Sequence, residues 1–182
     1  MTPRVKESRP SSILLTLLPR LKRSEGWRSY LYVDTTSNLT IAYGMNLAHV
    51  AIVPSGAHVV LAKNQKLYQV EGGHLLLTTV SEIPENIGDL LLVQKVLSII
   101  EVIDEKRPWI KKLDDVRREV IIELCFNIGL AVLDYGTFMS QLERGLFKEA
   151  ADNMRSWKWY DQVHATRAEP LCVMMETGNR EE

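Results

Sequence analysis

The sequence predicts a mostly helical α+β fold, in which a long helix joins a small N-terminal lobe with a β-hairpin to a helical C-terminal lobe. Residues 30–33 and 39–43 are rich in β-branched and aromatic side chains, and they flank a polar Thr-Thr-Ser-Asn stretch at 35–38. This pattern is typical of a β-hairpin. Residues 88–105 carry leucine, valine and isoleucine on a wide helical face. Beyond residue 108 the apolar positions recur with helical spacing, which indicates several further helices.

The N-terminal segment is expected to be a flexible arm followed by a short helix. Residues 1–12 contain two prolines and mixed charge without periodicity. Thr16 can cap a helix that has Pro19 in its first turn, where a missing N–H costs little, and Gly26 can end that helix. The expected division of the chain is an arm at 1–12 and one domain at 13–182, composed of an N-terminal lobe at 13–87, a connecting helix at 88–107 and a C-terminal lobe at 108–182.

Residues 57–70 are compatible with two structures. They can form one helix that stops at Gly72 and Gly73, or two strands at 59–62 and 67–70. We favour the helix.

The second half of the chain has clearer helix boundaries. Pro108 is expected to close the long helix, and Asp114 or Asp115 to open the next one. That helix keeps its apolar spacing up to Gly129 and has little polar face, so we expect it to be the central buried helix. Two amphipathic helices are expected at 137–144 and 147–157, separated by Gly145, with at most one further short helix in the tail, which contains Pro170 and Gly178.

Composition and charge exclude several classes of protein. The 182-residue chain has a formal net charge of −1, with 46% hydrophobic and 25% charged residues, as is usual for a globular protein. Because it lacks net positive charge and a long apolar run, we expect no nucleic-acid partner and no membrane insertion. Cys125 and Cys172 lie in apolar surroundings and are expected to be buried, reduced thiols. We recognise no signal peptide and expect synthesis in a cytoplasm.

Two carboxyl residues and a threonine form the candidate catalytic set. Glu25 is expected at the end of the first helix, Asp34 at the end of the hairpin's first strand, and Thr40 in its second strand. Hydrolysis of a glycosidic bond needs one protonated carboxyl for the leaving oxygen, and a second carboxylate that activates water or attacks the sugar. The negative end of the helix dipole favours the protonated form of Glu25, and the polar turn favours the ionised form of Asp34. Taken alone, this pairing also fits ordinary solvated carboxylates.

A resemblance to phage-type lysozymes, glycoside hydrolase family 24, strengthens this assignment. The family's spacing of Glu, eight residues, Asp, five residues and Thr is present without a gap. The resemblance covers roughly residues 17–178 and is weakest across 50–87. Three ordered blocks carry it: Glu25-Gly26 with Tyr32-Val33-Asp34 and Leu39-Thr40-Ile41-Ala42-Tyr43-Gly44; Leu113-Asp114-Asp115-Val116-Arg117-Arg118 with Phe126-Asn127-Ile128-Gly129; and Glu149-Ala150-Ala151-Asp152-Asn153-Met154 with Trp159-Tyr160 and Arg167-Ala168.

The resemblance implies a muramidase that cleaves bacterial peptidoglycan between N-acetylmuramic acid and N-acetylglucosamine, without a cofactor or a metal ion. The expected enzyme is a monomer that a phage uses to lyse its host, reaching the cell wall after release from the cytoplasm. A catalytically inactive glycan-binding or virion module and an antibacterial toxin domain remain alternatives. The implied roles are Glu25 as proton donor, Asp34 as the residue that positions or activates water, Thr40 beneath the cleaved bond, Phe126 and Asn153 lining the saccharide cleft, and Arg167 pairing with the catalytic Glu.

The sequence departs from the family at two pairs of positions. Met45 replaces the usual histidine after the glycine of the second strand, and its usual acidic partner on the long helix aligns with Lys95. Ser24 stands where the family often has an acidic residue, and Pro170 stands where it often has an arginine, so a second ion pair is also replaced. Because both partners change together, no unpaired buried charge is left. We expect Met45 to be buried close to Lys95, whose ammonium would point toward solvent.

Overall fold

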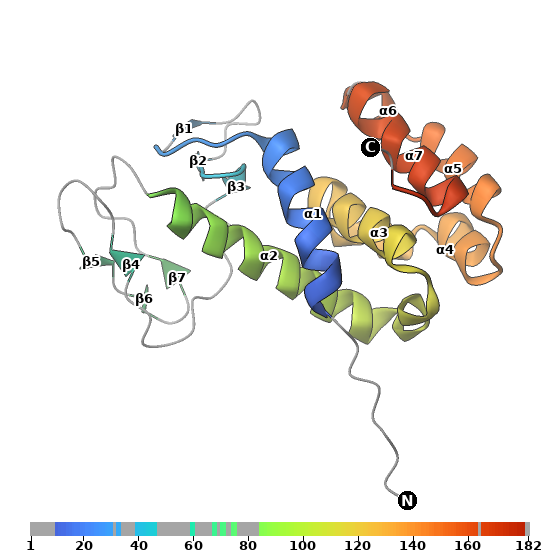
Figure 1. The fold of residues 1–182 in the computed structure, drawn as a ribbon, viewed down its shortest axis with the longest axis horizontal. Coiled ribbons are helices and arrows are strands. Elements are labelled where there is room, and N and C mark those ends of the chain that lie inside the picture. Colours follow the sequence, from blue (N-terminus) through green and yellow to red (C-terminus); the bar gives the residue numbers. More distant parts are fainter. Residues whose placement is uncertain are drawn as a thin grey trace, which may run out of the picture. The chain divides into compact units, whose positions relative to one another are not determined.

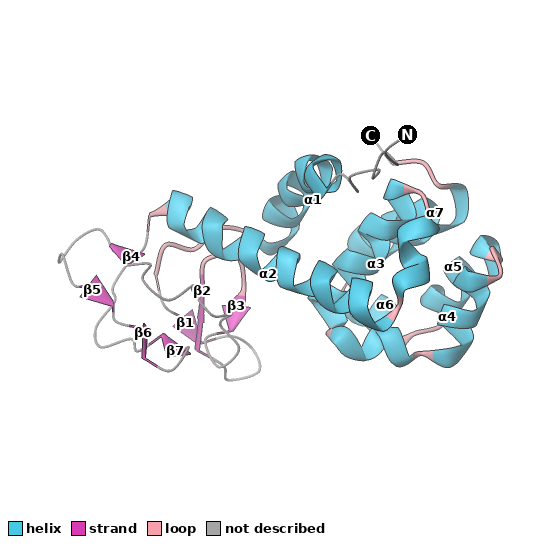
Figure 2. Ribbon diagram, turned by 90° about the horizontal axis from the view of Figure 1, so that it is seen from below, coloured by secondary structure: helices cyan, strands magenta, loops and turns pink. Residues whose placement is uncertain are grey.

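The chain forms two compact units in a computed structural model, which describes residues 10–30, 32–33, 39–46, 59–60, 67–68, 70–71, 74–75, 84–163 and 165–180. The unit formed by Met1–Leu17 and Ile99–Glu182 is called the helical unit, and the unit formed by Leu18–Ser98 is called the sheet unit. Helices dominate the described residues, which confirms the prediction of a mostly helical fold (Figure 2).

Helix α1 (Pro10–Glu25) begins six residues before the predicted start at Thr16, so that prediction is wrong. Proline is favoured at the first position of a helix, where its missing N–H has no intrahelical partner to lose. The Thr16 hydroxyl is not a cap but donates to Glu119 Oε1 at 2.6 Å. Pro19 lies inside the helix. The carbonyl it leaves unpaired belongs to Leu15, whose side chain is 77% exposed, so water can bond that oxygen.

An antiparallel three-stranded sheet forms the start of the sheet unit (Figure 1). Its strands, in spatial order, are β1 (Tyr32–Val33), β2 (Leu39–Ile41) and β3 (Met45–Asn46). Thr40 lies in the middle strand, opposite Tyr32 on one side and Asn46 on the other. Residues 34–38, which include Asp34, lie outside the described residues.

The predicted helix over 57–70 is wrong, and the alternative of short strands is correct for the residues described. Strand β4 (Val59–Val60) pairs with β5 (Leu67–Tyr68), and β6 (Val70–Glu71) pairs with β7 (His74–Leu75). Valine and tyrosine lose side-chain freedom in a helix and favour strands. The two glycines between β6 and β7 in the sequence are the residue type that two-residue hairpin connections favour.

The long helix α2 (Glu85–Lys106) confirms the helix predicted at 88–105, with three more residues at its start and one at its end. Its beginning packs closely on Trp27 and Ala42, because a Cβ at Gly88 would overlap the Trp27 ring and lie 3.3 Å from Ala42 Cβ. After α2, the 3₁₀-helix η2 (Pro108–Lys112) starts at the proline that was expected to close the long helix.

Helix α3 (Asp115–Ile128) is the buried centre of the helical unit, as predicted. The Asp114 side chain caps it by accepting a bond from Arg117 N at 2.9 Å. Gly129, with φ 96°, ends it. The buried residues include eight consecutive positions from 119 to 126. The 3₁₀-helix η3 (Leu130–Asp134) follows.

Four more helices complete the helical unit: α4 (Gly136–Glu143), α5 (Phe147–Arg155), α6 (Lys158–Gln162) and α7 (Ala165–Thr177). The first two confirm the helices predicted at 137–144 and 147–157. The expectation of at most one short helix in the tail is wrong, because α7 continues through Pro170. That proline removes one bond, to the carbonyl of the exposed Thr166 in the first turn, where water can replace it.

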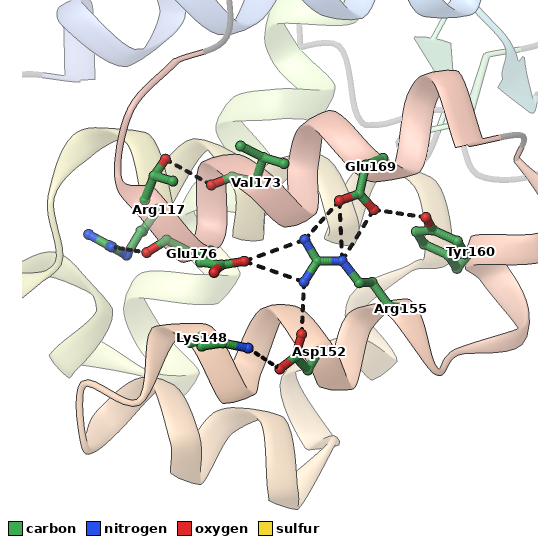
Figure 3. A network of polar contacts seen from close by, with 9 residues as sticks. Arg117, Lys148, Asp152, Arg155, Tyr160, Glu169, Val173 and Glu176 are labelled. Atoms are coloured by element: carbon green, nitrogen blue, oxygen red, sulfur yellow. Dashed lines mark hydrogen bonds and ion pairs between the residues drawn. The ribbon is translucent and has the colours of Figure 1, made fainter.

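Helices α5 and α7 lie side by side (Figure 1) and are joined by the guanidinium of Arg155 (Figure 3). Its Nη2 lies 2.8 Å from Glu169 Oε1, and its Nη1 lies 2.9 Å from Asp152 Oδ1 and 3.4 Å from Glu176 Oε2. The Tyr160 hydroxyl donates to Glu169 Oε2, and this bond raises the pKa of Tyr160. This network holds the C-terminal helix in place within the helical unit.

Cys125 and Cys172 are both free and buried, as predicted. Burial raises the pKa of each thiol to about 12, so both remain protonated and unreactive at neutral pH.

Candidate active site

Glu25 ends helix α1, and its carboxyl lies against the turn that joins β2 to β3. The helix stops at Gly26, which has φ 69° and donates its N–H to the carbonyl of Lys22. The chain then pairs with the turn, because Arg28 and Ala42 exchange two backbone hydrogen bonds of 3.1 and 3.2 Å. A Cβ placed on Gly44 would lie 3.2 Å from Glu25 Oε2. The glycine therefore leaves room for the carboxyl directly over the turn.

Replacing Gly44 with alanine is expected to destabilise the protein more than the same change at Gly26. Both glycines have φ 69°, where a Cβ costs about 1–2 kcal/mol, but only at Gly44 does the new methyl press on Glu25 Oε2. Chemical denaturation of both variants measures the difference. Equal losses of stability would show that the Glu25 carboxyl does not rest on this turn.

Tyr43, in the turn between β2 and β3, contacts the start of α2. Its side chain is 1% exposed, and its ring lies 5.2 Å from that of Trp27. Its hydroxyl lies 3.0 Å from Asp89 Oδ1 and 3.1 Å from Glu85 Oε1. Burial, together with these two carboxylates, raises the pKa of Tyr43, so the phenol stays neutral. The turn beneath Glu25 is thus held rigidly by packing and hydrogen bonds.

Lys95 on α2 is a half-buried cation of the sheet unit. Burial lowers the pKa of Lys95, and the Glu25 carboxylate acts in the opposite direction. Met45 is 2% exposed, which confirms its predicted burial. Lys95 is half-buried and loses part of its hydration, and the direction of its ammonium toward solvent remains a prediction. Met45 is uncharged, and Glu25 is one of the charges that act on this ammonium.

Thr40 lies in the centre of the small sheet and is 2% exposed. It belongs to the sheet unit, as Glu25 does. Asp34, the third member of the predicted catalytic set, lies outside the described residues.

The three remaining predicted site residues lie in the helical unit. Phe126 is in the last turn of α3 and is buried. Asn153 on α5 accepts a hydrogen bond from Trp157 Nε1 at 2.7 Å. Arg167 on α7 donates through Nη2 to Asn127 Oδ1. Each of these contacts is made within the helical unit, and the predicted pairing of Arg167 with Glu25 remains a prediction.

Two further features, a metal site and a membrane-spanning helix, are absent from the described part of the chain. No three histidine, cysteine, aspartate or glutamate side chains there come together as a metal site would require. None of the helices found in those residues has the length and hydropathy needed to cross a membrane.

The described part of the sheet unit contains a carboxyl at a helix end, a turn beneath it, a half-buried cation and a buried threonine in the strand that precedes the turn. The family model described as Phage lysozyme matches residues 22–167, and the chain belongs to this family. Comparison with curated proteins gives no match. Family membership makes the protein a lysozyme-type hydrolase with peptidoglycan as its substrate class.

Sequence analysis missed three features of this site: Gly44, Tyr43 and the effect of the Glu25 charge on Lys95. The first two lie within the matching block around Thr40 but have no chemistry of their own that would single them out. For the third feature, the available signal in the sequence is the simultaneous change at Met45 and Lys95, which Sequence analysis explains as the replacement of a structural pair.

Proposed function

We propose that the protein is a muramidase that cleaves the β-1,4 bond between N-acetylmuramic acid and N-acetylglucosamine. The observation that carries this proposal is the Glu25 carboxyl, held over the Gly44 turn in a chain that belongs to the phage lysozyme family. In this mechanism Glu25 gives its proton to the glycosidic oxygen as that bond breaks. A water molecule adds to the anomeric carbon and loses a proton to the Asp34 carboxylate.

The other predicted residues complete the mechanism. The Thr40 hydroxyl would lie under the cleaved bond on the side from which water attacks. Phe126 and Asn153 would line the saccharide cleft, and Arg167 would pair with Glu25. Two carboxyl groups and water suffice for this hydrolysis, so the proposal requires no cofactor and no metal ion.

We further propose that the protein acts as a monomer, with residues 13–182 as one lysozyme-like domain, to lyse a phage-infected bacterium. It would be made in the host cytoplasm and act on the wall after release. Its expected partner is peptidoglycan, with no nucleic acid and no membrane insertion.

The proposal is tested by digesting purified peptidoglycan, alongside a turbidity assay on Gram-negative cells stripped of their outer membrane. A muramidase leaves reducing ends on muramic acid, which borohydride converts to muramitol, and mass spectrometry identifies this product. Glucosaminitol ends instead would identify a glucosaminidase. Intact glycan strands after incubation with the folded protein would show that it only binds the wall.

The reaction is expected to invert the anomeric configuration. The water-activating role proposed for Asp34 places the attack on the face opposite the leaving oxygen, so a β-linked substrate gives an α-product first. Proton NMR of the freshly released sugar, recorded before mutarotation, measures this directly. An initial β-anomer would show retention and would exclude direct attack by water on the substrate.

A further inference from the structure

Trp157 lies in an aromatic cluster of the helical unit, where three other rings pack against it. Its ring centroid lies 5.1 Å from that of Tyr135 and 4.9 Å from that of Phe138, both in edge-to-face contact, and 6.5 Å from that of Trp159. Phe138 is 0% exposed and Trp159 is 8% exposed, so two of these rings belong to the core of the unit. Contacts of this kind with several neighbours fix the plane of the Trp157 ring.

The junction between α5 and α6 places this indole against Asn153 on α5. Trp157 has an extended backbone, with φ −78° and ψ 145°, directly before α6, and its Nε1 donates to Asn153 Oδ1 at 2.7 Å. An indole N–H can donate a hydrogen bond but cannot accept one. The carbonyl end of the Asn153 amide therefore faces Trp157, and its NH₂ end faces away from the indole.

This orientation leaves the donor hydrogens of Asn153 for a ligand. The backbone carbonyl of Asn153 accepts from Ser156 N at 3.0 Å and from Ser156 Oγ at 2.6 Å, and its Oδ1 accepts from Trp157. Among the residues that the structure describes, none accepts from Nδ2, and Asn153 is only half-buried. Without the indole, the amide could turn over and present its oxygen instead, because its two ends have nearly the same shape.

We propose that Trp157 is a positioning residue for Asn153: it fixes the amide so that Nδ2 donates to an acceptor oxygen of the bound glycan strand. This inference rests on the proposed function, in which Asn153 lines the saccharide cleft. Both sugars of the strand carry acetamido carbonyls, which are neutral acceptors that an NH₂ group can bind. A donor that is already fixed binds such an oxygen without first losing the freedom to turn.

Replacing Trp157 with phenylalanine is expected to raise KM for peptidoglycan about 3- to 10-fold and to leave kcat nearly unchanged, because it weakens one neutral hydrogen bond to the substrate and leaves the reacting groups in place. Asn153→Asp keeps the shape and the acceptor for Trp157 but has no N–H to donate, so it should raise KM at least as much. In Asn153→Asp, adding Trp157→Phe should raise KM little further, because no donor remains to be oriented. The matched control is Trp109→Phe, the same change at a half-buried tryptophan of η2, which should leave KM unchanged.

The measurement is kcat and KM on soluble peptidoglycan strands for the wild type and these variants, with thermal melts to confirm folding. Trp157→benzothienylalanine, whose ring has nearly the same shape but carries sulfur in place of N–H, replaces the phenylalanine variant if that variant does not fold. An unchanged KM in Trp157→Phe, or an equal rise in Trp109→Phe, would overturn the inference. Effects on KM that multiply fully in the double variant would also overturn it, because the Trp157 ring would then act on the glycan independently of Asn153.

A second readout separates this inference from the proposed function. Isothermal titration calorimetry measures the Kd of a tetrasaccharide of alternating N-acetylglucosamine and N-acetylmuramic acid, with Glu25→Gln added to every protein to prevent cleavage. The Kd should rise several-fold in Trp157→Phe and stay unchanged in Trp109→Phe, whether or not the wild type cuts peptidoglycan. An unchanged Kd in Trp157→Phe refutes the role of Trp157. A weakened Kd in a protein without hydrolytic activity refutes only the proposed function, and a complete absence of binding refutes both.

Discussion

Replacing Glu25 with glutamine is expected to lower the rate of peptidoglycan cleavage by about 10²- to 10⁴-fold, the usual contribution of a general acid. The glutamine side chain has the same shape and fits over the Gly44 turn, but its amide has no acidic proton to give to the leaving oxygen. Folding should be retained, because Glu25 is only partly buried at the end of α1. Release of soluble muropeptides from purified peptidoglycan measures the loss.

The matched control for this prediction is Glu105→Gln. Glu105 is an exposed carboxylate near the end of α2, so its replacement makes the same change in charge and side-chain shape. This variant should cleave at the wild-type rate. If Glu25→Gln is well folded and retains more than a few per cent of activity, Glu25 is not the proton donor.

The sequence predicted best those helices whose ends are marked by local chemistry. Asp114 and Gly129 bracket α3, and each is a residue type that acts at a helix end by itself, through a side-chain bond or through a positive φ. Such signals need no knowledge of the rest of the fold. The predicted bounds of α3 were therefore confirmed.

The predictions at two prolines and at the short strands were wrong, and the two errors have different reasons. Pro19 and Pro170 each remove one hydrogen bond, yet α1 and α7 continue through them, since packing on other helices supplies most of a helix's stability. The strands from Val59 to Leu75 contain two residues each, too few for an alternating pattern to be recognised.

The candidate site was predictable to the extent that it is local in the sequence. Glu25 and Thr40 belong to one short block, and the resemblance of that block to phage-type lysozymes implied their roles. The start of α2 packs on this block through Gly88 and through the hydrogen bonds of Tyr43 to Glu85 and Asp89. The chain between Tyr43 and Glu85 spans about half of the sheet unit, and no local pattern encodes that contact.

Replacing Arg180 with methionine is expected to destabilise the helical unit clearly. It leaves Glu119, which is 0% exposed on α3, without the guanidinium whose Nη2 lies 2.5 Å from Oε1. Removing one partner of a buried ion pair costs about 3–5 kcal/mol, and the partial exposure of Arg180 brings the expected loss to about 2 kcal/mol or more. Urea denaturation at neutral pH measures this loss.

Two comparisons test whether the loss arises from the buried charge of Glu119. Lys148→Met breaks another ion pair, at 2.8 Å from Asp152, but both of its partners are exposed, so little change in stability is expected. In Arg180→Met, adding Glu119→Gln should recover part of the loss, because a neutral amide costs less to bury than a carboxylate that has lost its guanidinium partner, and the amide can still accept from the Thr16 hydroxyl. A loss that is unaffected by Glu119→Gln would instead mean that Arg180 stabilises α3 through packing of its side-chain stem.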